Sequence, residues 1–176
     1  GATVSIEWMC IRTLLPQKAT VTLDKTTLDL VACTKRYPPW ETVPSESFGG
    51  LVIMNLNASH MDDESLLAYL ADFALFPDKQ VYPKVLITSV MPGTIAKKDR
   101  ILRAGDIIKT VNGSPIHTVQ DYQNILLKRP KTLEFETRDG IKTVMNTTDM
   151  IKDEVFVVET YKKPMSQTLV PQIINE

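Results

Sequence analysis

Hydrophobic and polar residues alternate along several short stretches of this chain, which is the pattern of half-buried strands. Residues 3–12 and 19–33 are rich in β-branched and apolar types, and a turn at residues 16–18 separates them. We therefore expect an N-terminal β-hairpin. The same reasoning predicts further strands at residues 51–56, 85–90, 133–137, 141–146 and 155–160.

Two segments instead show helical spacing. In residues 63–74, Leu66, Leu67, Leu70 and Phe73 fall on one face, and acidic residues occupy the first turn, where the helix dipole favours them. The second helix is predicted at residues 119–128. Thr118 is its expected N-cap with Asp121 three residues on, and Pro130 ends it.

The spacing of these elements divides the chain into four parts. Residues 1–34 form the hairpin extension, and residues 35–47 hold three prolines, which favours a linker. Residues 48–147 carry the main domain, and residues 148–176 a C-terminal strand and tail. The hairpin is either the end of a preceding domain or a pair of extra strands packed on this one. We favour the second, with residues 155–160 as the strand that pairs with it.

Composition narrows the function classes. The 176 residues have a formal net charge of −1, so charge attracts neither nucleic acid nor an anionic membrane surface. No apolar run is long enough for a membrane helix. Two cysteines, Cys10 and Cys33, are expected to be buried thiols, with one disulfide as the alternative. The chain opens without an initiator Met, which suggests a fragment of a larger protein.

A series of turn signals follows the first helix. Pro92 and Gly93 make a turn, and residues 102–108 (LRAGDII) reverse the chain into a strand. Residues 111–113 (VNG) supply the positive φ angles of a tight turn, and the Asp139-Gly140 pair predicts a hairpin. Together with residues 48–51 (FGGL), these segments resemble a PDZ domain, and more closely the PDZ domain of HtrA/Deg-type serine proteases.

The resemblance covers roughly residues 47–147 and implies an α+β fold. This is a PDZ-like antiparallel β-sandwich or partly open barrel, capped by two helices and here extended by the N-terminal hairpin. It also implies β-augmentation, in which an extended peptide adds as a strand beside residues 51–55 while a glycine-containing loop holds its terminal carboxylate. The implied peptide-binding residues are Phe48, Gly49, Gly50, Leu51, Val52, Ile53, Val119, Gln123 and Leu126.

Two positions depart from the family pattern. Gly49 and Gly50 adjoin, where the family alternates one glycine with apolar residues, so a simple bend into the strand is an open alternative. Val119 stands where many PDZ domains carry a histidine, and it predicts a ligand with a hydrophobic tail. Tyr122 and Ile125 are expected nearer the core.

Catalysis has no supporting constellation. His60 lies beside Ser59 and Asp62, but sequence neighbours do not assemble a triad, so a loop or cap role is expected. His117 precedes the second helix and could touch a ligand. The acids at residues 62–64 lack the spacing of a metal site. No cofactor is expected.

Together with the lack of a catalytic constellation, the resemblance implies a non-enzymatic protein–protein interaction module, an accessory of a larger, HtrA/Deg-like serine protease. Its partner is a peptide or protein C-terminus, or an internal segment of the parent, with homo-oligomer contacts possible. The alternative is a structural or oligomerisation domain whose groove is closed or self-occupied. Residues 35–47 and 162–176 are the candidates for that occupation.

Overall fold

The computed structural model describes residues 2–9, 15–23, 43–76, 79, 82–162, 166 and 168, apart from the side chains of residues 2, 23, 65, 67 and 74. Within these ranges the strands are β1 (Ala2–Met9), β2 (Pro16–Leu23), β3 (Ser45–Phe48), β4 (Leu51–Asn55), β5 (Val85–Val90), β6 (Ile107–Val111), β7 (Ser114–Pro115), β8 (Thr132–Thr137) and β9 (Lys142–Asn146). The helices are η1 (Ala58–Asp62), α2 (Glu64–Leu75), α4 (Ile95–Asp99), α5 (Val119–Leu126) and α6 (Thr147–Tyr161).

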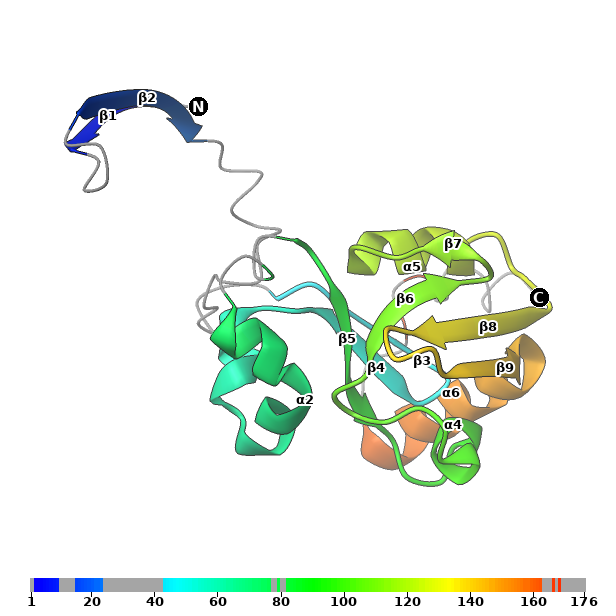
Figure 1. Cartoon of the computed structure of the whole chain (residues 1–176). Coiled ribbons are helices and arrows are strands. Elements are labelled where there is room, and N and C mark those ends of the chain that lie inside the picture. Colours follow the sequence, from blue (N-terminus) through cyan, green and yellow to red (C-terminus); the bar gives the residue numbers. More distant parts are fainter. Residues whose placement is uncertain are drawn as a thin grey trace.

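The main sheet is antiparallel and runs β3-β4-β5-β6-β8-β9, with the short β7 paired to β6. Figure 1 shows α5 over one part of this sheet, α2 beside another, and α4 next to α6 near β9. The predicted α+β, PDZ-like architecture is confirmed, with the difference that the sheet does not close into a barrel. More helices cover it than the two expected.

The predicted N-terminal hairpin is present, but the turn expected at residues 16–18 was wrong, because these residues are the first three of β2. β1 and β2 pair along their whole length, from Ala2 opposite Leu23 to Met9 opposite Pro16, and among the described residues they pair with no other strand. Val4, Ile6 and Trp8 point to one face, and each remains more than two-fifths exposed. Cys10, Cys33 and most of the predicted Pro-rich linker lie outside the described residues.

The C-terminal strand prediction was wrong. Residues 155–160 belong to α6, a helix of 15 residues, so they cannot pair with the N-terminal hairpin. Their β-branched and aromatic side chains suggested a strand, but a helical face formed by Met150, Glu154 and Val157 is buried instead. Asn146 caps this helix by accepting a hydrogen bond from the amide of Thr148.

Other helix predictions hold with small shifts. α2 begins one residue later than expected, and it buries Leu66, Leu70 and Phe73 in a small core with Leu86 and Ile107. α5 has the predicted capping box, in which Thr118 and Asp121 satisfy each other's main-chain amides.

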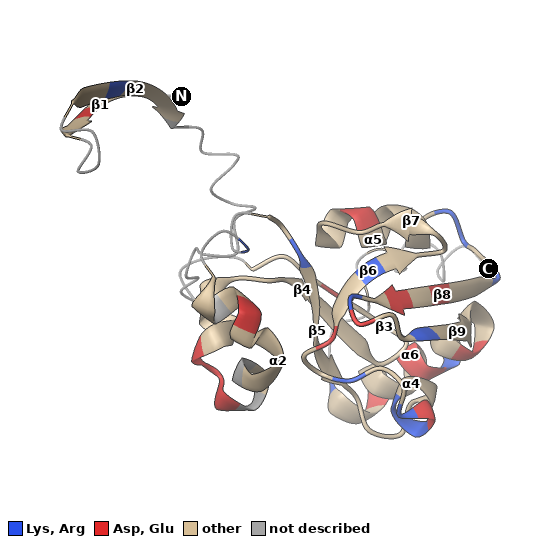
Figure 2. Ribbon diagram, in the orientation of Figure 1, with Lys and Arg blue, Asp and Glu red and all other residues tan. Residues whose placement is uncertain are grey.

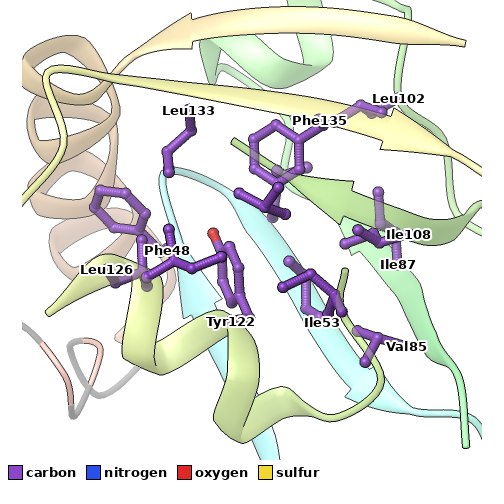
Figure 3. Close-up of a cluster of buried hydrophobic side chains, with 14 of the residues drawn as sticks. Phe48, Ile53, Val85, Ile87, Leu102, Ile108, Tyr122, Leu126, Leu133 and Phe135 are labelled. Carbon is purple, nitrogen blue, oxygen red and sulfur yellow. The ribbon is translucent and has the colours of Figure 1, made fainter. Parts of the chain in front are cut away.

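The larger core lies between α5 and the sheet. It packs apolar side chains from β3, β4, β5, β6, β8 and β9 against one face of α5 (Figure 3). Tyr122 lies at its centre, with its ring 6.2 Å from that of Phe135. Because the core joins α5 to both β3 and β4, the groove expected between α5 and β4 has apolar walls already in contact.

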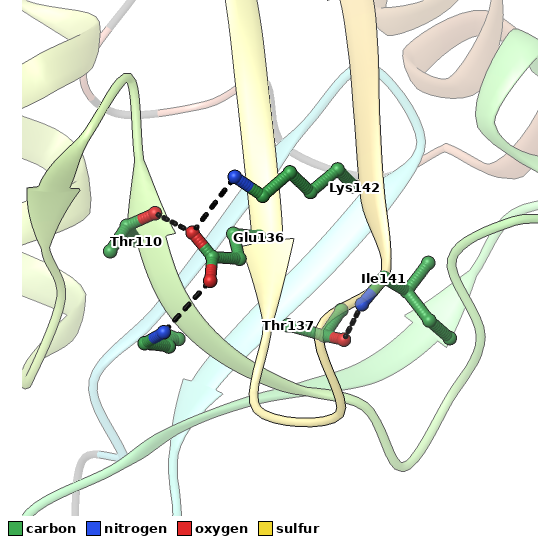
Figure 4. Close-up of polar contacts among 6 residues, drawn as sticks. Thr110, Glu136, Thr137, Ile141 and Lys142 are labelled. Carbon is green, nitrogen blue, oxygen red and sulfur yellow. Dashed lines mark hydrogen bonds and ion pairs between the residues drawn. The ribbon is translucent and has the colours of Figure 1, made fainter.

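The opposite edge of the sheet is held by polar contacts. Glu136 on β8 accepts hydrogen bonds from Lys109 at 2.8 Å and Thr110 at 3.4 Å, and Lys142 of β9 lies 3.6 Å away (Figure 4). In the β8–β9 turn, the amide of Ile141 donates to the Thr137 hydroxyl. These contacts hold β6, β8 and β9 together. None of them involves a residue that was predicted to bind a peptide.

Candidate functional site

The site begins at the turn between β3 and β4. Gly49 and Gly50 both have positive φ, 59° and 83°, which suits a two-residue hairpin turn with right-handed strand twist. Phe48 and Leu51 face each other across this turn, and β3 continues along β4 as far as Ser45 opposite Met54. β3 therefore lies on the β4 edge that the sequence had assigned to an incoming peptide.

The other edge of β4 pairs with β5. Both edges of β4 are thus occupied within the chain, and β3 contains residues 45–47 of the segment that was predicted to be a linker. This part of the linker prediction was wrong. Ser45 is exposed, but Glu46, Ser47 and Phe48 are all buried, because this strand contacts both β4 and α5.

Most of the predicted peptide-binding side chains are members of the large core. Phe48, Leu51, Ile53, Val119 and Leu126 are each at most 2% exposed. Val52 and Gln123 are half-buried. The structure therefore brings the predicted residues together, but their apolar side chains pack on one another.

Two hydrogen bonds join α5 to the strands that it covers, and Gln123 makes the first of them. Its Nε2 donates to Glu46 Oε2 at 2.7 Å, joining α5 to β3. At the start of α5, the amide of Val119 donates to Asn55 Oδ1 at 2.8 Å, joining the helix to the end of β4. These two bonds fix the distance between the helix and both strands.

Glu46 is a buried carboxylate, 2% exposed. Besides Gln123, it accepts hydrogen bonds from the hydroxyls of Ser166 and Thr168, the second at 2.8 Å. Three neutral donors thus replace the water that a buried carboxylate would lose. They bring Ser166 and Thr168 beside β3, more than one hundred residues away in sequence.

Glu154 supplies a second carboxylate, at the glycine turn itself. The amide of Gly49 donates to its Oε2 at 3.0 Å, and the amide of Ser166 donates to its Oε1 at 3.1 Å. Glu154 is fully buried. A turn amide that the sequence assigned to a ligand carboxylate therefore binds an internal one.

α6 approaches this turn closely. A side chain at Gly49 would place its Cβ 2.6 Å from Met150 Cβ, and one at Gly93 would meet the ring of Phe156 at 2.7 Å. Asp153, beside Glu154, accepts the amide of Ile95 at the start of α4. The helix is thus seated on the β3–β4 turn and on α4 at once.

The two carboxylates also affect Tyr122. Its hydroxyl is buried and, among the described residues, has no hydrogen-bond partner. Burial raises the pKa of this hydroxyl far above its ordinary value, and the nearby charges of Glu46 and Glu154 raise it further. This environment therefore favours the neutral phenol.

The model of the PDZ domain family matches residues 72–138. A PDZ domain is present here. A search of curated proteins finds no match to the chain. The matched residues run from α2 to the β8–β9 turn and include the Pro-Gly, Gly-Asp and Asn-Gly turns and all of α5. The β3–β4 turn and α6 lie outside the match.

PDZ domains are modules for peptide and protein interaction that bind C-termini and are generally non-catalytic. The histidines agree with a cap role for His60: its Nδ1 accepts the amide of Asn57 at 3.1 Å in a capping box, and burial lowers its pKa. His117 is exposed and donates its amide to Asp121. In the described ranges no cluster of metal-ligating side chains occurs, and no helix is long and apolar enough to span a membrane.

Sequence reasoning missed four polar residues of this site: Glu46, Glu154, Ser166 and Thr168. Glu46 lies in residues 35–47, which were predicted to be a linker. Glu154 immediately precedes residues 155–160, which were predicted to be a strand. A usable signal existed for Glu154, because it falls four residues after Met150 and three before Val157 on one helical face. A carboxylate at such a position requires a buried partner.

Proposed function

We propose that this PDZ domain is an interaction module whose groove is occupied by its own chain. In this proposal β3 takes the place of a peptide strand on β4, Phe48 fills the apolar pocket of a ligand's last residue, and Glu154 takes the place of its carboxylate. The observation that carries it is the pairing of β3 with β4 from Phe48 to Ser45.

Three further features support self-occupation. Phe48 is fully buried among side chains of β4 and α5, as a terminal ligand residue would be. Glu46, two residues before it, is bound from α5 by Gln123. The strand runs antiparallel to β4 and reaches the glycine turn last, which is the direction expected of an added peptide.

A hydrophobic peptide terminus would then bind only after β3 is displaced. Gly49 to Ile53, Val119, Gln123 and Leu126 remain the proposed peptide-contacting residues in that opened state. The hydroxyls of Ser166 and Thr168 stabilise the closed state, because without them the Glu46 carboxylate keeps a single described side-chain donor, Gln123. Their removal should favour opening.

The test is an NMR titration of peptides with hydrophobic C-terminal residues, following the amides of Gly49 to Ile53. We expect no shift with the intact chain, and shifts with the S166A/T168A variant and with a chain ended after Lys162. Binding of equal strength by the intact chain would contradict self-occupation. The variant T148A, which changes an exposed hydroxyl at the start of α6, serves as the control.

A second function, a structural or oligomerisation domain, is favoured by the pairing of both β4 edges within the chain. It predicts that neither the intact nor the opened chains bind any peptide while circular dichroism shows all of them folded. Size-exclusion chromatography with light scattering would then report a homo-oligomer. A monomer that binds no peptide would contradict both proposals.

We further propose that the parent protein resembles an HtrA/Deg serine protease, for which this domain is a non-catalytic accessory. The support is the order of its parts: a glycine turn, a strand, a helical insert and then the Pro-Gly, Gly-Asp and Asn-Gly turns. A serine-directed fluorophosphonate should label the full-length parent and leave this chain unlabelled. An unlabelled, folded parent would contradict the protease assignment alone.

A further inference from the structure

A second recess lies on the far side of β5 from β4. β6 pairs with β5 only at Val85 and Leu86, and Ile87 then exchanges main-chain hydrogen bonds with Gly105 and Asp106. Beyond that point no described strand pairs with this side of β5. A cleft of about 600 Å³ opens there, between the last three residues of β5 and the segment 97–104.

Three cationic side chains line this cleft: Lys97 on α4, Arg100 at its end, and Arg103 on the following turn. All three residues are exposed, and among the described residues none of them forms an ion pair. Figure 2 shows blue segments on α4 and on the loop after it. In a chain of net charge −1, this is a local concentration of positive charge.

The acids nearest in sequence mainly serve other contacts, although the charge of Asp106 interacts with that of Arg103. Within the described part of the chain no acidic side chain lines it. Asp106 accepts the main-chain amide of Arg103 at 2.7 Å and so serves the turn, while Asp153 accepts the amide of Ile95. Asp99 is exposed on α4.

One wall of the cleft is formed by the last three residues of β5. Thr88, Ser89 and Val90 are half-buried. Thr88 turns its hydroxyl away, donating to the carbonyl of Val52 on β4 at 3.2 Å. The strand therefore presents its backbone edge toward the three cations, and an edge of this kind binds extended chains better than compact anions.

We propose that this cleft binds an extended acidic peptide segment of a partner protein. The segment would lie along Thr88–Val90, with its carboxylates at Lys97, Arg100 and Arg103. Guanidinium groups bind carboxylates through two parallel hydrogen bonds, which gives both affinity and orientation. The cleft is far larger than one small anion, and none of its lining residues belongs to the β3–β4 turn or to α6.

The experiment uses the whole chain and an end-capped hexapeptide of alternating Asp and Val, with the Asn–Val peptide as its neutral match. We expect the acidic peptide to shift the amides of Thr88 to Val90 and to bind more weakly as salt rises. The triple variant K97Q/R100Q/R103Q should bind about tenfold more weakly. K98Q, on the same helix but outside the cleft lining, should bind as the unmodified chain does.

Four outcomes would overturn the proposal. The neutral peptide could bind as tightly as the acidic one, which removes the role of the cations. Inorganic phosphate alone could produce the same shifts at the same affinity, which makes the cleft a small-anion site. The shifts could also fall on Gly49 to Ile53, which assigns the peptide to the groove. Absence of any shift equally contradicts it.

Discussion

β4 and β5 are neighbours in one sheet, but their edges meet opposite surroundings. β4 is paired on both sides, and the carboxylates of Glu46 and Glu154 are buried next to its turn. The last residues of β5 pair with no described strand on one side, and three of the side chains that line this side are cationic and exposed. The β4 edge, where a PDZ fold is expected to bind a peptide, is paired with β3. The β5 edge at Thr88–Val90, where no ligand was expected, pairs with no described strand.

The largest effect is expected from G49A, which would disrupt the packing of α6 on the β3–β4 turn. Gly49 combines a positive φ with a Cβ position 2.6 Å from Met150 Cβ, so alanine would be strained and would also push α6 away. We expect a loss of at least about 2 kcal/mol in the free energy of unfolding, measured by urea denaturation.

G113A is its matched control, because Gly113 has a φ of 73° but no atom within 4 Å of its Cβ position. Backbone strain alone should cost it about 1 kcal/mol. Equal losses in the two variants would mean that α6 is not held against the β3–β4 turn.

E154A removes the carboxylate that accepts the amides of Gly49 and Ser166. Leaving these donors without an acceptor should lower the free energy of unfolding by about 1–3 kcal/mol, and E154Q, which keeps one acceptor oxygen, should lose less. Hydrogen exchange at the Gly49 amide should accelerate in both. The exposed Glu159 on the same helix provides the control, since E159A should change stability by less than about 0.5 kcal/mol.

The third prediction concerns pH and the sheet edge beyond the groove. The hydrogen bond from Lys109 holds the pKa of Glu136 below its ordinary value, and the charge of Lys142 adds to this. A lowered pKa stabilises the fold above the unfolded-state pKa, and this contribution is lost as pH falls through the folded value. Between about pH 5 and pH 3, E136Q should therefore lose less stability than the unmodified chain. Parallel losses in the two proteins would exclude this contribution.

The smallest effect is expected on the open side. K97Q/R100Q/R103Q should change the free energy of unfolding by less than about 0.5 kcal/mol, because these exposed side chains form no ion pair in the described structure. Thermal denaturation at low and high salt measures this. A loss comparable to that of E154A would show that the cations hold the fold together, and the contrast between the two edges would fail.

The turn chemistry of the domain could be predicted from the sequence because it is local. The Asp139-Gly140 hairpin and the Thr118 cap depend on residues within a few positions of each other, and the structure contains both. β5 was predicted with its observed bounds because Val85, Leu86 and Ile87 form a continuous buried run.

The closure of the groove depends on contacts that span the chain. Gly49 and Glu154 are 105 residues apart, and Thr168 binds Glu46 across 122 residues. A single sequence carries no signal for such pairs. Because residues 155–160 were predicted to be a strand, Glu154 was not recognised as a buried residue of a helix. The β-branched residues favoured a strand, although Asn146 is a good helix N-cap.

The tight turn at Gly49 and Gly50 has a consequence for competition. It tethers β3 to its partner strand by two residues, and so short a tether gives an effective concentration on the order of millimolar or above. Such hairpins also re-form within about 1–10 μs, faster than a dilute molecule arrives by diffusion. A freely diffusing strand is therefore outcompeted each time β3 detaches. In the intact chain, where Ser166 and Thr168 also hold β3, a competitor anchored to the same assembly would reach a comparable effective concentration.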